Sequence, residues 1–546
     1  MKFKNLVFNL KKHAASVDWK LLVFLILFLN VKIAVKVAAI ILIYILQVDF
    51  KIGFSFKNTR LPLFYPIVIG VAVLNWIIFS SHTALNYNIV CLLGIGFWLL
   101  CILAMHQVKL MVETIGIETI HKTILVFFLI NAAVSLFVLL NIICQIHDVN
   151  PYRFQGLYQK YFISTGDYVK GITFDVSTTN AVLNAFGVIY FLVRKNVAIV
   201  LLCMAIMLFT GSNTINLMLA GVLALLFAFK TTKDQKSIIV VCLMFLGVFM
   251  FKISPQNDEY LYRTYYRLRY REYPPNEVVN LYPVSITQKP DSVLSTEERQ
   301  EKTAAIYMIN AKKAWELKHN NILKWLASRK PQIPKASIHS PEYQNKIDTN
   351  NERRRLIAFV NTHKNSLPEA RRLEMASIVP GKISAMQQTL SYLQQYPQKI
   401  LTGAGIGNFS SKMAFKATNL GVAGGFSAKY AYINGSFLTN HLDLYLNFFG
   451  RSGDWHSLIN SPNSVYDQLL SEYGLIGLIA FVVFYLGYFI KDYKKLTYGI
   501  PLLILISGIL LLDYWFEQLS IIVFFELLML VNIKENAIKT VSDGSE

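Results

Sequence analysis

Two short segments near the C-terminal end combine residue types that bind phosphate or move protons. In the first segment, Gly403, Gly405 and Gly407 alternate with other residues. Glycine lets the backbone approach a ligand closely and exposes N–H groups to phosphate oxygens. A dinucleotide-binding unit would need a strand before these glycines, whereas the pattern here predicts a helix that ends near Tyr396. By itself, the glycine run therefore indicates only a close approach of backbone to a ligand.

The second segment begins at Ser461-Pro462-Asn463 and continues into an apolar run. At 3.6 residues per turn, Asn463, Tyr466, Asp467 and Gly474 fall on one helix face. Asp467 and Glu472 lie where this helix is expected to enter the membrane. An ionisable side chain is costly there, so both carboxylates are candidate functional residues.

Four cations are candidates for phosphate binding. Arg153 and Lys170 lie in the segment that precedes a predicted span at 174–193, and Lys382 and Arg451 lie nearer the C-terminus. Arginine holds phosphate with two parallel N–H donors, and lysine acts as a point charge. We expect these residues to bind an anionic substrate.

Two histidines and two carboxylates are candidates for proton transfer, and one amide is a candidate for orienting the acceptor. His456 stands seven residues before Asn463, and His441 is a second candidate base. Asp175 and Asp467 are carboxylate alternatives. Asn463 cannot accept a proton near neutral pH, but its amide can orient an acceptor hydroxyl.

The elements that position these residues are long apolar runs. Hydrophobic residues make up 54% of the 546 residues and charged residues only 16%, which excludes a soluble protein. A hydrocarbon core requires about 20 apolar residues per helix. We therefore predict an all-α polytopic membrane bundle of about 12 spans, with one large, mainly helical extracytoplasmic loop. The predicted spans are 19–31, 33–49, 62–80, 86–105, 123–146, 174–193, 196–211, 214–229, 236–252, 464–490, 497–512 and 514–532.

These spans imply three consecutive parts: 1–252 with nine spans, the loop domain 253–460, and 461–546 with three spans and a tail. Every second short loop is basic, for example those holding Arg194-Lys195 and Lys494-Lys495. Basic loops stay in the cytoplasm, so both termini are expected inside and the large loop outside. The formal charge of +20 is spread over short loops and the large loop. It therefore favours an anionic lipid-linked substrate over nucleic acid.

The predicted loop domain contains several local signals. Tyr and Arg occur at high density over 258–271, which is typical of a membrane-interface helix or of rings that stack on sugars. A capping box at 295–298 starts one predicted helix, and further helices are predicted at 351–363, 368–378 and 382–395. The five cysteines lie in or beside apolar runs without metal-ligand spacing, so we interpret them as small buried residues.

Taken together, the glycine run and the 461–477 segment resemble the O-antigen ligase and O-antigen polymerase superfamily of bacterial envelope enzymes. Weaker similarities are Arg153-Phe154-Gln155-Gly156-Leu157, Gly171-Ile172-Thr173-Phe174-Asp175 and Thr210-Gly211-Ser212-Asn213. The resemblance implies transfer of glycan from an undecaprenyl diphosphate carrier at the outer face of the inner membrane, without nucleotide sugar, metal or other cofactor. It also implies inversion at the sugar carbon.

Three positions depart from that family's pattern. Asn463 stands where the family usually has histidine, Asn213 replaces an arginine, and Lys382 stands where an arginine usually precedes the glycine element. Either another group supplies the histidine's role or the chain is a divergent branch.

The functional alternatives remain open at this point. The enlarged loop and the missing histidine favour a polymerase of repeat units, and the alternative is a ligase that joins glycan to lipid A core. A transporter would use midplane ionisable groups, of which Glu526 is one. An envelope scaffold or sensor is a fourth possibility. For the enzyme, a chain-length regulator is a possible partner.

Overall fold

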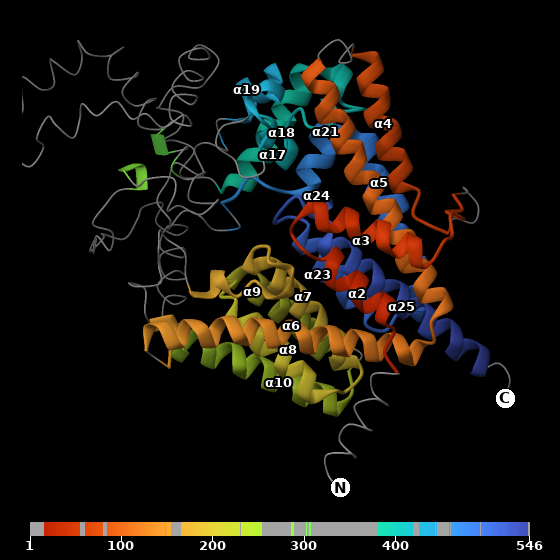
Figure 1. Ribbon diagram of the computed structural model, residues 1–546, viewed down its shortest axis with the longest axis vertical. Coiled ribbons are helices and arrows are strands. Elements are labelled where there is room, and N and C mark those ends of the chain that lie inside the picture. Colours follow the sequence, from red (N-terminus) through yellow and green to blue (C-terminus); the bar gives the residue numbers. More distant parts are fainter. Residues whose placement is uncertain are drawn as a thin grey trace, which may run out of the picture. The chain divides into compact units, whose positions relative to one another are not determined.

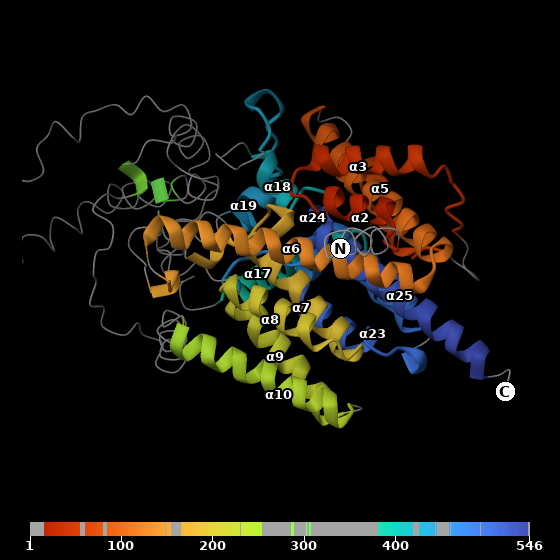
Figure 2. The same cartoon turned by 60° about the horizontal axis from the view of Figure 1, so that its bottom comes forward.

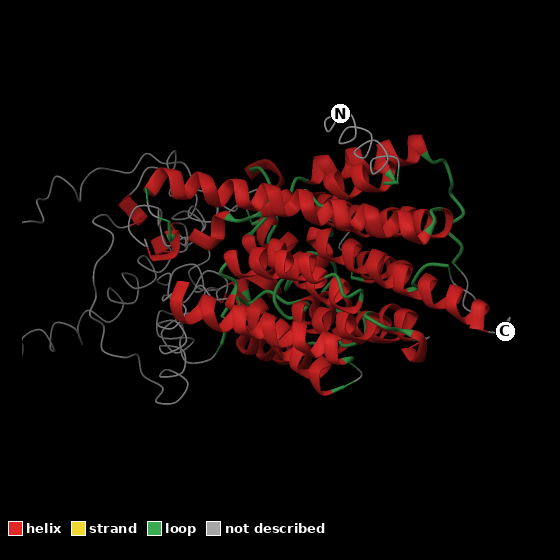
Figure 3. Ribbon diagram, turned by 90° about the horizontal axis from the view of Figure 1, so that it is seen from below, coloured by secondary structure: helices red, strands yellow, loops and turns green. Residues whose placement is uncertain are grey.

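A computed structural model of the chain describes most of its apolar regions and part of the predicted loop domain (Figure 1). The described residues are 16–54, 60–79, 85–147, 149–153, 165–229, 231–253, 286–288, 302, 305–306, 380–418, 425–442, 444, 458, 460–491 and 493–543. Within these ranges every regular element is a helix, and none is a strand (Figure 3). The predicted all-α class is confirmed for this part of the chain.

Each predicted span overlaps one or more helices of the described chain. The N-terminal helices are α2 (Trp19–Phe28), α3 (Ile33–Leu46), α4 (Phe64–Ile78), α5 (Leu85–Thr114) and α6 (Ile117–Ile146). The next are α7 (Ser177–Val193), α8 (Val197–Phe209), α9 (Asn213–Ala228) and α10 (Lys233–Val248). Near the C-terminus are α17 (Gly381–Gln395), α18 (Lys412–Ala417), α19 (Gly435–Asn440), α21 (Val465–Ala480), α22 (Gly487–Ile490), α23 (Gly499–Ile509), α24 (Trp515–Gln518) and α25 (Ser520–Asp543).

Four of the described helical segments are long and apolar enough to cross a membrane. They are Leu85–Thr114, Ile117–Gln145, Lys233–Ile253 and Val465–Ile490, and seven other apolar helices are shorter. Many large apolar side chains on these helices are exposed, such as Phe137 at 73% and Leu217 at 72%. Lipid tails would cover such surfaces, so the helices indicate a membrane protein.

The chain forms two compact units that interleave in sequence. The first comprises Met1–Val73, Leu93–Val279 and Leu475–Glu546; the second comprises Leu74–Leu92 and Asn280–Gly474. This grouping does not follow the three consecutive parts expected from hydropathy, because packing draws 74–92 into the unit that also contains α17, α18 and α19.

The core of the first unit is built around α7 and α25. From Ile521 to Val531, every residue of α25 is at most 2% exposed, and α7 is buried over nearly all of its length. Helices that are apolar on all sides belong in the middle of a bundle. Around them, α6, α8, α9 and α10 lie alongside one another (Figures 1 and 2).

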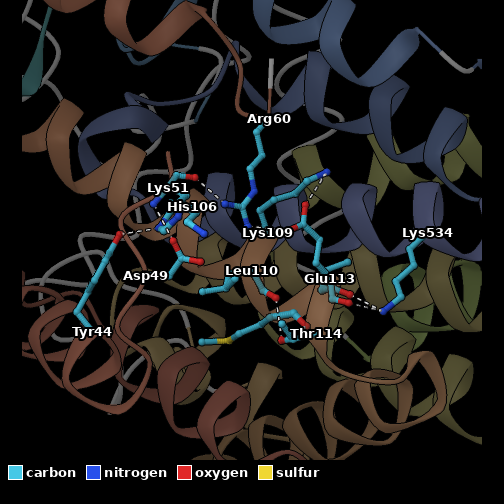
Figure 4. Close-up of polar contacts among 12 residues, drawn as sticks. Tyr44, Asp49, Lys51, Arg60, His106, Lys109, Leu110, Glu113, Thr114 and Lys534 are labelled. Atoms are coloured by element: carbon cyan, nitrogen blue, oxygen red, sulfur yellow. Dashed lines mark hydrogen bonds and ion pairs between the residues drawn. The ribbon is translucent and has the colours of Figure 1, made fainter. Parts of the chain in front are cut away.

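Several helices extend beyond the predicted spans: α6 begins at Ile117, before the predicted start at 123, and α25 ends at Asp543, after the predicted end at 532. Helix α5 continues nine residues beyond the predicted end at 105, through a polar turn where Glu113 pairs with Arg60 and Lys109 (Figure 4). Lys534 of α25 donates to the carbonyls of Val112 and Ile115, at 2.6 and 2.7 Å. An ammonium at a helix C-terminus satisfies its open carbonyls and the negative end of its dipole, so this polar end remains helical.

The predicted span 514–532 is also divided. Leu519 has a φ of 69° and separates α24 from α25. An L-residue in this left-handed region ends the regular helix.

Candidate functional site

The glycine loop, residues 401–411, packs directly on a break in α21. Gly474 has φ 64° and ψ −162° inside α21, so the carbonyls before it lose their normal helical partners. The loop supplies replacements: Ala404 N–H donates to Ser471 O at 2.8 Å, and Gly405 N–H donates to Glu472 O at 3.0 Å. The N–H groups of the glycine loop therefore form hydrogen bonds with the carbonyl groups that the break in α21 leaves open.

Glycine is required on both sides of this contact. A Cβ on Gly403 would collide with the backbone of Glu472, and a Cβ on Gly474 would collide with the backbone of Leu401. Both glycines also have positive φ. Gly403 of the glycine loop and Gly474 of α21 thus lie on the two sides of one close backbone-to-backbone contact.

The Glu472 carboxylate organises the rest of the loop. One of its oxygens accepts from Gly407 N–H at 2.9 Å, and the other accepts from Phe409 N–H at 3.1 Å. The side chain is completely buried. Backbone N–H groups converging on a buried carboxylate form a strong anion site, and the anion here is Glu472 itself.

This geometry corrects the expectation that the glycine N–H groups face phosphate. Gly403 N–H donates to Lys399 O at 2.7 Å, and Gly405 and Gly407 donate to Glu472 as described. All three glycines and Glu472 are buried. In this structure their role is to shape the loop, because their donors and the carboxylate are already used within the protein.

A second buried carboxylate lies one and a half turns before Glu472. Asp467 is 1% exposed and lies beside Ser410 of the glycine loop and beside Thr389 and Lys382 of α17. Three segments, α17, the glycine loop and α21, thus meet at one carboxylate. We call Asp467, Lys382, Thr389 and Ser410 the Asp467 cluster.

His441 lies against the same two segments. Its Nδ1 is 3.0 Å from Gln388 Oε1, and its ring stacks on Phe409 with centroids 5.0 Å apart. Since an amide oxygen only accepts, Nδ1 carries the proton and Nε2 presents a lone pair. Gln388 and Phe409, which contact His441, are followed in the sequence by Thr389 and Ser410, which lie beside Asp467. The imidazole and the Asp467 carboxylate therefore contact neighbouring residues of the same two segments.

Burial lowers the pKa of His441 to about 3. The side chain is 1% exposed, and no other described residue bonds its Nε2. His441 is therefore neutral near pH 7, with an acceptor nitrogen available inside the second unit.

Lysines lie at both ends of α17. Lys382 Nζ donates to the carbonyl of Asn463, which ties the start of α17 to the start of α21. Beyond the other end, Lys399 lies over the ring of Phe79, and burial lowers its pKa to about 8. Sequence reasoning missed Lys399, although its position four residues before Gly403 and after a proline was a usable signal.

The second unit thus unites several of the predicted site residues. Lys382 is half-buried and donates to the carbonyl of half-buried Asn463 at the edge of the Asp467 cluster. Tyr466, also half-buried, directly precedes Asp467 in α21. His441 joins them through α17 and the glycine loop.

Other predicted site residues belong to the first unit. Asp175 accepts from the Thr179 hydroxyl at 2.9 Å, in the turn that leads into α7. Lys170 is half-buried just before Gly171, and Arg153 ends the short helix Pro151–Arg153.

The turn that contains Lys170 rests on buried asparagines. Ile172 N–H donates to Asn131 Oδ1 at 3.0 Å, and Asn180 Nδ2 donates to Val169 O at 2.9 Å. Asn131 and Asn180 also bond each other at 2.8 Å. The segment Gly171–Asp175, which resembles the O-antigen enzymes, is therefore a loop held in place by hydrogen bonds to buried asparagines.

Arg451 and His456 lie outside the described residues, as do the Tyr-Arg segment 258–271, the capping box at 295–298 and the predicted helices 351–363 and 368–378. The predicted helix 382–395 is confirmed as α17.

Comparison of the chain with protein-family models, curated proteins and solved structures gives no match.

Proposed function

We propose that the chain is a membrane glycosyltransferase that transfers glycan from an undecaprenyl diphosphate carrier during surface polysaccharide assembly, as a polymerase of repeat units. The proposal includes about 12 spans in a bacterial inner membrane, both termini in the cytoplasm and residues 253–460 in the periplasm. One observation carries it: the segments that resemble the O-antigen enzymes meet at Asp467, with an ammonium and an uncharged imidazole beside them.

In the proposed reaction, an acceptor sugar hydroxyl attacks the anomeric carbon of the donor glycan. The new carbon–oxygen bond forms as the bond to the carrier diphosphate breaks, and undecaprenyl diphosphate leaves with the bonding electrons. The hydroxyl proton passes to Asp467, which lies within the cluster that Lys382 joins. Lys382 stabilises the negative charge that grows on the leaving diphosphate.

His441 and Asn463 have positioning roles in this proposal. The Nε2 lone pair of His441 accepts a hydrogen bond from a sugar hydroxyl, which compensates for the histidine that Asn463 replaces. Asn463 lies at the exposed edge beside Lys382 and orients the acceptor.

The test uses purified protein in proteoliposomes with lipid-linked repeat units. Asp467→Asn removes the proton acceptor and is expected to slow chain formation by roughly 10²–10⁴-fold. Lys382→Ala removes the leaving-group charge and is expected to cost roughly 10²–10³-fold. The exposed Asp234→Asn and Lys233→Ala serve as matched controls and should retain full rate. Full chain formation by both cluster variants would reject this site.

A carbohydrate gel after gene deletion separates polymerase from ligase. Loss of a polymerase leaves single repeats, whereas loss of a ligase leaves long chains that remain on the carrier.

A transporter is the second candidate, because Glu526 is fully buried in α25 and accepts from the Tyr65 hydroxyl. A buried carboxyl group in an apolar helix is typical of proton or ion pathways. Lipid-linked glycan movement that persists in Asp467→Asn but stops in Glu526→Gln would favour transport.

A further inference from the structure

The first unit contains a cavity of about 330 Å³ that the proposed reaction does not use. The start of α6, the end of α7, the start of α23 and the C-terminal part of α25 line it. The charge rule places all four of these ends on the cytoplasmic side. The cavity is therefore expected at the depth of the inner-leaflet headgroups.

The inner wall of the cavity holds a fixed network of charges. Arg194 pairs with Glu535 and lies over the Tyr190 ring, 4.9 Å from its centroid. His121 lies 2.7 Å from the same carboxylate and bonds the Tyr190 hydroxyl. The Glu535 carboxylate and the Tyr190 ring therefore hold the Arg194 guanidinium in a fixed position at the wall of the cavity.

Two donors in this wall remain unused. The hydroxyl of Tyr498, a side chain only 1% exposed, and the Nε–H of Arg194 have no hydrogen-bond partner within the described part of the chain. A buried donor without a partner is costly, so both favour a ligand with strong acceptor oxygens. A guanidinium beside a hydroxyl is typical of phosphate binding.

The rim of the cavity carries a carboxylate, which favours a cationic group of the ligand. Glu118 is exposed in the first turn of α6 and makes no ion pair with any described residue. The lining residues Glu118 and Glu535 together outweigh the charge of Arg194. A purely anionic headgroup would therefore meet net negative charge. In contrast, a phosphate followed by an ammonium meets hydrogen-bond donors at its phosphate end and a carboxylate acceptor at its ammonium end.

We propose that this cavity binds the phosphoethanolamine headgroup of an inner-leaflet phospholipid. Its phosphate accepts from Tyr498 and Arg194, and its ammonium group pairs with Glu118. The volume lies in the range of ligand sites. This proposal is independent of the glycosyl transfer reaction.

The test is native mass spectrometry of delipidated full-length protein, titrated with phosphatidylethanolamine or phosphatidylglycerol of identical acyl chains. The wild type is expected to prefer phosphatidylethanolamine. Tyr498→Phe should weaken its binding roughly tenfold through loss of one charge-assisted hydrogen bond. Glu118→Gln should remove the preference between the two lipids while phospholipid still binds.

Two exposed residues supply matched controls: Tyr493→Phe and Asp234→Asn should bind both lipids as the wild type does. Equal binding of the two lipids by the wild type, or unchanged binding by both cavity variants, would overturn the proposal. Competition by soluble phosphoethanolamine at concentrations matching the lipid would instead assign the site to a soluble ligand and overturn the lipid assignment.

Discussion

His441 and Glu472 illustrate two different uses of a buried polar side chain. Glu472 accepts hydrogen bonds from the backbone of Gly407 and Phe409 and fixes a loop, whereas His441 keeps one ring nitrogen available. A satisfied buried group stabilises one conformation, and an unsatisfied one costs free energy that a ligand can recover. We therefore expect substitution of His441 to change the pH dependence of stability, and substitution of Glu472 to loosen the loop that it holds.

Protonation of His441 should destabilise the fold in acid. Its folded-state pKa of about 3 lies below the ordinary value of 6.5, so stability is complete above pH 6.5 and falls as the pH drops toward 3. Between pH 7 and pH 5 the loss should be about 2 kcal/mol, at roughly 1.4 kcal/mol per pH unit below pH 6.5. Thermal unfolding in detergent at several pH values measures it.

The informative comparison is His441→Phe, which keeps a ring against Phe409 but does not titrate. Its unfolding midpoint should fall less between pH 7 and pH 5 than that of the wild type. His147→Asn, at an exposed histidine, should behave as the wild type. Identical pH profiles for all three proteins would contradict burial of a neutral imidazole.

Neutralising Glu472 should loosen the glycine loop even without substrate. In Glu472→Gln an N–H₂ group replaces one acceptor oxygen, so either Gly407 or Phe409 loses its partner. We expect a loss of about 2–3 kcal/mol in unfolding free energy and faster hydrogen exchange over residues 401–411. Exposed Asp234→Asn is the control, and unchanged exchange in the loop would refute the structural role.

At the scale of elements, the break in α21 is the feature that positions the site. The helix opens at Gly474, the glycine loop fills the opening, and α17 closes over Ser410 and Asp467. Irregular backbone at membrane depth persists only where protein satisfies it. The break and the loop should therefore fail together.

Gly474→Ala tests this coupling. At φ 64° and ψ −162° the backbone lies in a region that is essentially restricted to glycine, so alanine costs roughly 1–3 kcal/mol. Its Cβ would also collide with the backbone of Leu401, so the unfolding midpoint should drop markedly. Gly221→Ala, in the middle of α9 with open space around it, should be neutral or stabilising. Equal stability of the two variants would mean that the contact is not essential.

At the scale of the whole molecule, the testable feature is the orientation in the membrane. Loops with Arg194 and Lys195 are expected inside, and the residues near α19 outside. In a Cys144→Ser background, Thr439→Cys should react with an impermeant maleimide in right-side-out vesicles, and Lys195→Cys only in inverted ones. The other four cysteines are buried. Labelling of both positions from one side would reject the topology.

The sequence by itself determined the helical class and the positions of most helices. Apolar runs, basic loops and capping residues act over a few positions, so α17 and the cores of the apolar helices were predictable. The glycine run and the 461–477 segment could also be recognised locally, but their hydrogen-bond partners could not. A glycine run indicates a flexible backbone and does not indicate which acceptor its N–H groups meet.

Only the tertiary structure decided those partners. Glu472 lies 65 residues from Gly407 and takes the donors that the sequence reading assigned to phosphate. Gln388 sets the tautomer of His441 from 53 residues away, and α6, α7, α23 and α25 enclose a cavity that no local pattern indicates. These features depend on long-range packing and burial, which fix hydrogen-bond partners only once the chain has folded.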